Sequence, residues 1–376
     1  MSEVKREVKV EDFKKTISLL QNKDFGFYFF TLDTKGNPTA GIANIYEHVK
    51  VLNELGYRAH ILHEKNDYKL HADTEGPGIS EWLGEEYASL PHLSIESKEL
   101  NVGPQDFIVI PEIFSNIMDE LKNLPCKKLV FSQSYEYALE LLPMGRRWTD
   151  YGFNDVITTS DKQAQFIKGL FPSTNTHVVP VSISDYFKDS DKPKVPVVAI
   201  HTRVPGDAAK LVKMFYFQNP MFRWVSFKEL KGLNKREFAK ELSNSCLAVW
   251  LDDVSGFGTL PLEAMECNTP VIGKIPNMIP EWMEEETEEG VVIKNNGIWT
   301  NTHLNIPELI GTYLNLWLEG NVPVELTDAM ESTKGMYTPE KQVSTIKEVY
   351  GNIISNRVEE FNKIMAVVAK TEEVKK

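Results

Sequence analysis

The sequence predicts an α/β protein with two halves, each built on a mostly parallel sheet covered by helices. Short apolar runs typical of strands alternate with segments in which apolar residues recur at helical spacing. This alternation occurs twice, on either side of the polar, proline-bearing stretch 185–196, DYFKDSDKPKVP, which is typical of a linker. A chain of 376 residues is also long enough for two separate hydrophobic cores.

The elements of the first half follow from changes in the spacing of apolar residues. The run 25–32, FGFYFFTL, predicts a buried strand, and the polar loop DTKGNPTAG follows it. The next segment predicts a helix closed by Gly56, because its apolar residues recur at helical steps: Ile42, Ile45, Val49, Leu52 and Leu55. Four later runs predict further strands: RAHILH, FIVIP, KLVFS and DVITTS.

The second half repeats this alternation. Strands are expected at VPVVAI, FRWVSF and CLAVWLD, with one helix through Lys210 and Met214 and another near 235–244. Helices are then expected in the tail, because Thr338-Pro339 places a proline where helices favour it. The chain is therefore predicted to contain two Rossmann-like domains and a helical tail, with the boundaries 1–185, 186–336 and 337–376.

Composition and charge exclude several classes of function. The formal net charge of −13 argues against nucleic acid as the main partner, which needs a basic face. No apolar run approaches the length of a transmembrane helix, and the charged N-terminus does not resemble an export signal. The three scattered cysteines predict neither disulfides nor a metal site. A cytoplasmic location is expected.

The most informative segment, 255–273, reads SGFGTLPLEAMECNTPVIG. Its glycine turn lets backbone N–H groups approach a phosphate, and a short helix capped by Thr259 adds partial positive charge there. Glu263, about one turn into the helix, presents two oxygens that can accept both hydroxyls of a vicinal diol. Asn268 is expected to end the helix in a left-handed conformation. This order predicts a site for a phosphorylated sugar nucleotide. The alternative is an ordinary strand–turn–helix–strand unit with Glu263 in solvent.

In this segment the chain resembles the retaining GT-B glycosyltransferases of the "glycosyl transferases group 1" family. Three parts of the family signature match in order and spacing: Gly256-Phe257-Gly258, Glu263-Ala264-Met265 and Thr269-Pro270-Val271. The resemblance implies a GT-B fold, in which two Rossmann-like domains enclose a cleft. It also implies that Glu263 holds the ribose of the donor nucleotide. The donor phosphate and sugar would lie on the turn formed by Gly256, Phe257, Gly258, Thr259 and Leu260.

The chain departs from the family signature at the position of its first glutamate, which contacts the hydroxyls of the donor sugar. Ser255 stands there. A serine can hydrogen-bond a sugar hydroxyl but offers no charged bidentate acceptor. Asp252 and Asp253 lie close upstream and are alternative acceptors.

Other parts of the resemblance concern the diphosphate. Arg203, just after the strand VPVVAI, and Lys210 resemble the arginine and lysine that bind it, although Lys213 is a rival to Lys210 because the spacing is one residue wide. Surface salt bridges are the alternative reading for both cations. This pair would supply the local positive charge that an acidic protein needs to bind a diphosphate.

Three further sites resemble the first domain and the tail of the family. Gly41, in Pro38-Thr39-Ala40-Gly41, would face the donor phosphates across the cleft. Gln133, at the end of the strand KLVFS, would lie near the sugar, unless it is only a capping amide. The helix after Tyr337 resembles the closing helix that crosses back to the first domain.

No metal site and no cofactor are predicted. The D-x-D triplet 189–191 lies in the linker and not after a strand, and the acidic stretch 284–289 is expected to be a solvated surface turn. His60 and His63, three apart on a strand, point to opposite faces and cannot share a metal.

These features predict a retaining, metal-independent glycosyltransferase with a nucleotide-diphosphate sugar as donor and a glycan or other hydroxyl compound as acceptor. Arg203, Lys210 and Glu263 would carry the reaction by holding the donor. Ser255 motivates an alternative, a non-catalytic GT-B subunit that binds glycan or a partner transferase. A sugar-nucleotide epimerase is a weaker option. Peripheral contact with a membrane stays open for a lipid-linked acceptor.

Overall fold

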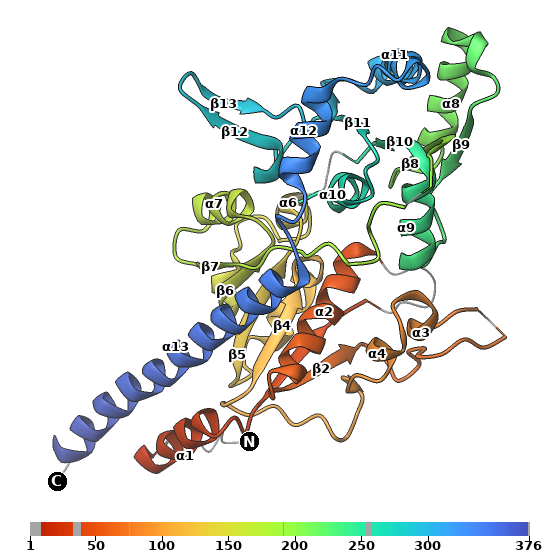
Figure 1. Cartoon of the computed structure of the whole chain (residues 1–376). Coiled ribbons are helices and arrows are strands. Elements are labelled where there is room, and N and C mark those ends of the chain that lie inside the picture. Colours follow the sequence, from red (N-terminus) through yellow and green to blue (C-terminus); the bar gives the residue numbers. More distant parts are fainter. Residues whose placement is uncertain (1–8, 33–38, 75, 191, 253–256, 375–376) are drawn as a thin grey trace.

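The structure is a computed structural model that describes residues 9–32, 39–74, 76–190, 192–252 and 257–374. Two parallel sheets, one after the other along the chain, are each covered by helices (Figure 1). The predicted α/β class with two halves is therefore confirmed.

The first sheet has seven parallel strands in the order β3-β2-β1-β4-β5-β6-β7. Its strands are β1 Gly26–Phe30, β2 Arg58–His63, β3 His92–Ser94, β4 Phe107–Pro111, β5 Lys127–Ser132, β6 Phe153–Thr158 and β7 Asn175–Val178. The phenylalanines of the run 25–32 are at most 4% exposed, which confirms that this strand is core. The strand order reverses between β1 and β4, so the sheet has a switch point there.

The helices of the first half connect these strands. They are α1 Val10–Gln21, α2 Ala40–Glu54, α3 Ile79–Trp82, α4 Glu85–Ala88, α5 Met118–Leu121, α6 Tyr135–Glu140 and α7 Asp161–Leu170, with 3₁₀ helices at Glu112–Ile117 and Trp148–Tyr151. The helix predicted before Gly56 is α2. Gly56 follows it with a φ of +80°, a left-handed conformation that glycine adopts without strain.

The second sheet has five parallel strands in the order β14-β11-β10-β8-β9. Its strands are β8 Val195–His201, β9 Ser226–Glu229, β10 Ser245–Trp250, β11 Val271–Lys274 and β14 Ile298–Thr300. Its helices are α8 Asp207–Gln218, α9 Lys235–Asn244, α10 Thr259–Glu266, α11 Ile306–Glu319 and α12 Val324–Thr333, with 3₁₀ helices at Pro220–Phe222, Glu281–Met283 and His303–Asn305. This sheet reverses its strand order between β8 and β10.

The acidic stretch 284–289 is not the surface turn that we predicted. It forms most of an antiparallel hairpin, β12 Glu284–Thr287 and β13 Gly290–Ile293, which projects from the second half (Figure 1). The base of the hairpin contacts the first half, because the Glu284 carboxylate pairs with the Lys162 ammonium of α7 at 2.7 Å. This ion pair ties the first residue of the acidic stretch to the first half.

The chain crosses between the halves twice, before β8 and after α12. The Ile183 N–H of the first crossing donates to the Tyr337 carbonyl of the second at 2.8 Å. The boundaries predicted at 185/186 and 336/337 lie within these two crossings.

The tail is one continuous helix, α13 Pro339–Val374, and not the several helices that we expected. It lies beside α1 and α2 of the first half (Figure 1). Its buried residues join the core beneath α2: Ile346, Tyr350, Ile353 and Phe361. Among the described residues, no helix, α13 included, is long and apolar enough to cross a membrane.

A buried histidine links α13 to α2 and gives folding a pH dependence. His48 is fully buried, and its Nδ1 lies 3.0 Å from the Tyr350 hydroxyl. Burial lowers the pKa of His48 to about 3. Below pH ~6.5 the unfolded chain takes up a proton at this side chain that the folded chain does not. The stability that the folded protein gains from keeping His48 neutral is therefore fully present above pH ~6.5 and is lost as the pH falls toward 3.

We expect His48→Gln to reduce the acid sensitivity of folding. Between pH 7.5 and 5.5 the wild type should lose about 1.4 kcal/mol more of its free energy of unfolding than this variant. Urea unfolding at both pH values measures the difference. Because the comparison uses the change with pH, any constant cost of the substitution cancels. Equal losses in the two proteins would contradict the assignment.

Candidate functional site

A pocket lies between the two halves, where the switch points of both sheets contribute to its wall. Residues that follow β1 and β4 line it from the first half, and residues that follow β8 and β10 line it from the second. In open α/β sheets, ligands bind at the carboxyl ends of strands beside such switch points. The first half contributes Thr31, Leu32, Thr39, Ala40, Gly41, Ile42, Ile45, Pro111, Glu112, Ile113, Gln133, Ser134, Tyr137 and Thr159, and the second, with the crossing residue Val181, contributes His201, Arg203, Trp250, Asp252, Phe257, Gly258, Thr259 and Leu260.

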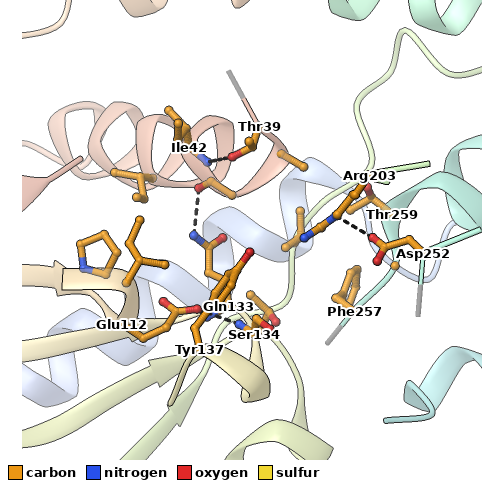
Figure 2. Close-up of a pocket in the computed structure, with 18 of the residues that line it drawn as sticks. Thr39, Ile42, Glu112, Gln133, Ser134, Tyr137, Arg203, Asp252, Phe257 and Thr259 are labelled. Carbon is orange, nitrogen blue, oxygen red and sulfur yellow. Dashed lines mark hydrogen bonds and ion pairs between the residues drawn. The ribbon is translucent and has the colours of Figure 1, made fainter. Parts of the chain in front are cut away.

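The start of α2 forms one wall of the pocket (Figure 2). Thr39 caps the helix, since its hydroxyl accepts the Ile42 N–H at 3.4 Å. The Gln133 amide reaches this helix from the end of β5 and donates to the Gly41 carbonyl at 3.0 Å. The structure therefore places Gly41 and Gln133 together in the pocket wall. Of the predicted loop 38–41, Pro38 lies outside the described residues.

The amide of Gln133 is held from both ends. Its oxygen accepts from the Asn44 side chain at 3.1 Å, and Asn44 in turn accepts from Gln342 of α13 at 3.1 Å. The Gln342 oxygen accepts from Ser182, in the first crossing, at 2.6 Å. Hydrogen bonds thus connect the pocket wall to both the tail helix and the crossing.

Glu112 is a pocket residue that the sequence analysis missed. It follows β4 directly and is only 2% exposed. Its Oε1 accepts the backbone N–H groups of Gln133 and Ser134, each at 2.8 Å (Figure 2). Burial raises the pKa of this carboxyl to about 7, although the two N–H groups favour the charged form. An acidic residue directly after a predicted strand was the signal that could have identified it.

Arg203 enters the pocket from the end of β8. Its Nε lies 2.7 Å from the Asp252 carboxylate, which follows β10 (Figure 2). The Asp252 side chain is 5% exposed and that of Arg203 is 48% exposed, so a buried carboxylate fixes a cation whose far end reaches the pocket. His201 lies beside this pair, and burial lowers its pKa. Asp252, an alternative acceptor for the donor sugar in the sequence analysis, is thus bound to Arg203.

The start of α10 faces the pocket from the second half. The helix begins at Thr259, so Gly258 and not Thr259 occupies the cap position. Gly258 has a φ of +72°, and a Cβ added there would lie 2.8 Å from the Trp250 ring. The Phe257 carbonyl accepts from the Trp282 indole at 2.7 Å. The first N–H groups of a helix have no partner within it. Because Pro261 has no N–H, Thr259 and Leu260 supply these donors at the start of α10, and both line the pocket.

Phe257, Gly258, Thr259 and Leu260 therefore lie in the pocket wall with Arg203, Gly41 and Gln133. Ser255, Gly256 and Asp253 lie outside the described residues. Asn268 has the predicted left-handed conformation, with a φ of +53°.

Glu263 and Lys210 are not part of the pocket wall. Glu263 lies on α10 beyond the pocket, half-buried, and makes no hydrogen bond to another described residue through its side chain. Burial raises its pKa to about 7, and the charge of Lys235 opposes this. Lys210 is exposed on α8 and pairs with Asp207 at 2.9 Å. Its rival Lys213 is exposed on the same helix.

No model of a known protein family matches the chain. It is similar to the alpha-1,6-glucosyltransferase of Actinobacillus pleuropneumoniae serotype 7 (strain AP76), with 22% identity over 339 residues, 83% of this chain and 91% of that protein. The structure resembles sucrose-phosphate synthase from Thermosynechococcus elongatus, with a TM-score of 0.60 at 10% identity, covering 88% of this chain and 99% of that one. It also resembles HepE of Anabaena, solved in complex with UDP-glucose, with a TM-score of 0.60 at 12% identity, covering 87% and 99%.

Proposed function

The chain has the GT-B fold of the glycosyltransferases that it resembles, and we propose that it is itself a retaining, metal-independent glycosyltransferase. It would transfer a sugar from a nucleotide-diphosphate sugar to a hydroxyl group of a glycan or another acceptor. One observation carries the proposal. Arg203 and the start of α10 face the start of α2 across a pocket at the switch points of both sheets.

The diphosphate of the donor is assigned to Arg203 and the first N–H groups of α10. The ion pair with Asp252 engages the Nε of Arg203, and the guanidinium has further N–H donors that a phosphate could use. A guanidinium matches the geometry of phosphate oxygens better than an ammonium does. Lys210 would have to leave Asp207 to reach the same phosphate. We therefore assign it a smaller part than the sequence predicts.

The reaction needs charge stabilisation more than it needs a nucleophile from the protein. The acceptor oxygen would form a bond to the anomeric carbon while the bond from that carbon to the diphosphate oxygen breaks. The proton of the acceptor hydroxyl would pass to the departing phosphate. Arg203 and the amides of α10 would stabilise the negative charge that develops on this leaving group. Crossings at two points allow the halves to close and exclude water, a competing acceptor.

UDP-glucose is the first donor to test. The curated relative is named as a glucosyltransferase, and the HepE structure contains UDP-glucose. Glu263 would hold the ribose of this donor. Its carboxylate has no hydrogen-bond partner among the described side chains, so both oxygens are available to the two ribose hydroxyls.

We expect Glu263→Ala to lower transfer from UDP-glucose by about 100-fold or more, since two hydrogen bonds to a charged acceptor are lost. Burial disfavours the charged form of Glu263, so the variant should be at least as stable as the wild type near pH 8. Transfer kinetics and thermal unfolding measure the two effects. Full transfer activity in the folded variant would overturn the ribose assignment.

A further inference from the structure

At the switch point of the first sheet, one buried hydroxyl lacks a partner among the described residues, and one carboxyl oxygen makes no hydrogen bond to them. The Thr31 hydroxyl, 1% exposed, has no hydrogen-bond partner in the described part of the chain. The Glu112 side chain uses Oε1 for both of its hydrogen bonds to other described residues, which leaves Oε2 uncommitted. Both residues line the pocket. A buried polar group without a partner costs stability, so a ligand that hydrogen-bonds to the Thr31 hydroxyl would be favoured.

The two residues are neighbours because of the sheet register. Phe29 of β1 pairs with Val109 of β4, and continuing this register places Thr31 opposite Pro111. Glu112 is the next residue. Thr31 and Glu112 therefore both lie at the carboxyl ends of adjacent strands, where both line the pocket.

The surrounding wall indicates the chemical class of this ligand. Among the described lining residues of the first half, Glu112 is the only charged side chain, and Lys, Arg and His do not occur. The other polar side chains there are neutral: Thr31, Thr39, Gln133, Ser134, Tyr137 and Thr159. In its ionised form, which prevails above pH ~7, the carboxylate of Glu112 would repel an anionic group but can accept a hydrogen bond from a hydroxyl. The cation of the pocket, Arg203, lies in the opposite half.

We propose that Thr31 and Glu112 form a subsite for a hydroxyl group of a neutral sugar, the acceptor of the transfer. The inference rests on the proposed function and adds the class of acceptor to it. Thr31 would donate to or accept from the sugar, and the Oε2 atom of Glu112 would accept from it. An acceptor that carries a carboxylate or phosphate near this point would be excluded.

Glu112 also holds the turn at Gln133 and Ser134, so its removal would disturb the wall for a structural reason. Glu112→Gln separates the two roles. The glutamine oxygen can still accept both N–H groups, while its amide nitrogen replaces an acceptor with a donor at the Oε2 position. Thr31→Val removes only the hydroxyl at nearly constant shape, and Thr31→Ser retains it.

Saturation-transfer NMR tests the subsite, with UDP bound and with methyl α-D-glucopyranoside and its uronic acid counterpart as probes. The wild type and Thr31→Ser should bind the neutral glycoside and not the uronide. Glu112→Gln and Thr31→Val should bind it about tenfold more weakly, the effect of losing one hydrogen bond. Absence of neutral glycoside binding to the wild type, equal uronide binding or unchanged affinity in both variants would overturn the subsite.

Calorimetry with UDP-glucose on the same variants separates this inference from the proposed function. Donor affinity should stay within about twofold of the wild type in all three variants. A parallel loss of donor affinity would place Thr31 and Glu112 in the donor site and overturn the subsite alone. Failure of the wild type to bind any nucleotide sugar would instead contradict the proposed function.

Discussion

Arg203→Ala is expected to lower kcat/KM for transfer from UDP-glucose by about 10²–10³-fold, the usual loss when a donor to developing charge is removed. The variant loses the guanidinium that would hold the diphosphate. It also removes the cation paired with the Asp252 carboxylate, whose charge would then repel the donor more strongly. Arg203→Lys should recover only part of the activity, because an ammonium lacks the paired donors of a guanidinium. Steady-state kinetics measure all of these values.

A matched control for Arg203 is Lys228→Ala. Lys228, on β9 of the same sheet, also forms an ion pair, with Glu241 at 2.7 Å, but it does not line the pocket. Its removal should change kcat/KM by less than about twofold, because exposed ion pairs contribute little. If the two variants lost activity equally, the effect would be one of general charge and not of the pocket.

Gly258→Ala is expected to destabilise the protein by about 2–4 kcal/mol and to weaken donor binding. A non-glycine residue at a φ of +72° is strained, and the new Cβ would lie 2.8 Å from the ring of Trp250. Trp250 is 1% exposed and packed against Trp282 and Trp299, so it cannot move away freely. The start of α10 would have to shift, and its N–H donors with it.

Gly206→Ala is the control that separates the two causes. Gly206 precedes α8 with a φ of +86°, but a Cβ there would have no neighbour within 4 Å. The free energy of unfolding of this variant should fall only by the cost of a left-handed backbone at a non-glycine residue, about 1–2 kcal/mol. Urea unfolding followed by tryptophan fluorescence compares the two proteins. Equal losses would mean that contact with Trp250 is not what requires glycine at position 258.

Much of the fold follows from the sequence because buried strands of parallel sheets are continuous apolar runs. FIVIP and KLVFS have this form, and both are fully buried strands. β3 and β7 are three and four residues long and carry polar residues, so they resemble loops. The hairpin 284–293 was not predicted because its first strand, EEET, contains only glutamate and threonine.

The site could be predicted only in part, because spacing along the chain does not fix the direction of a side chain. Arg203 lies two residues after the end of β8, and strand ends converge in a parallel sheet, so its place in the pocket was predictable. Lys210 lies on a helix whose start at Asp207 provides a local partner, which keeps the ammonium outside the pocket wall. Thr31 and Glu112 could not be predicted as a pair from the sequence, because only the pairing of β1 with β4 brings these two distant segments together.

Calorimetric titration with a panel of nucleotide-diphosphate sugars, starting with UDP-glucose, tests the central claim most directly. That claim is that the pocket between the two halves binds the donor through Arg203 and the start of α10. We expect at least one donor to bind with one-to-one stoichiometry, and Arg203→Ala to bind it at least about tenfold more weakly. Binding of none of these donors, or equal affinity in the wild type and Arg203→Ala, would contradict the account.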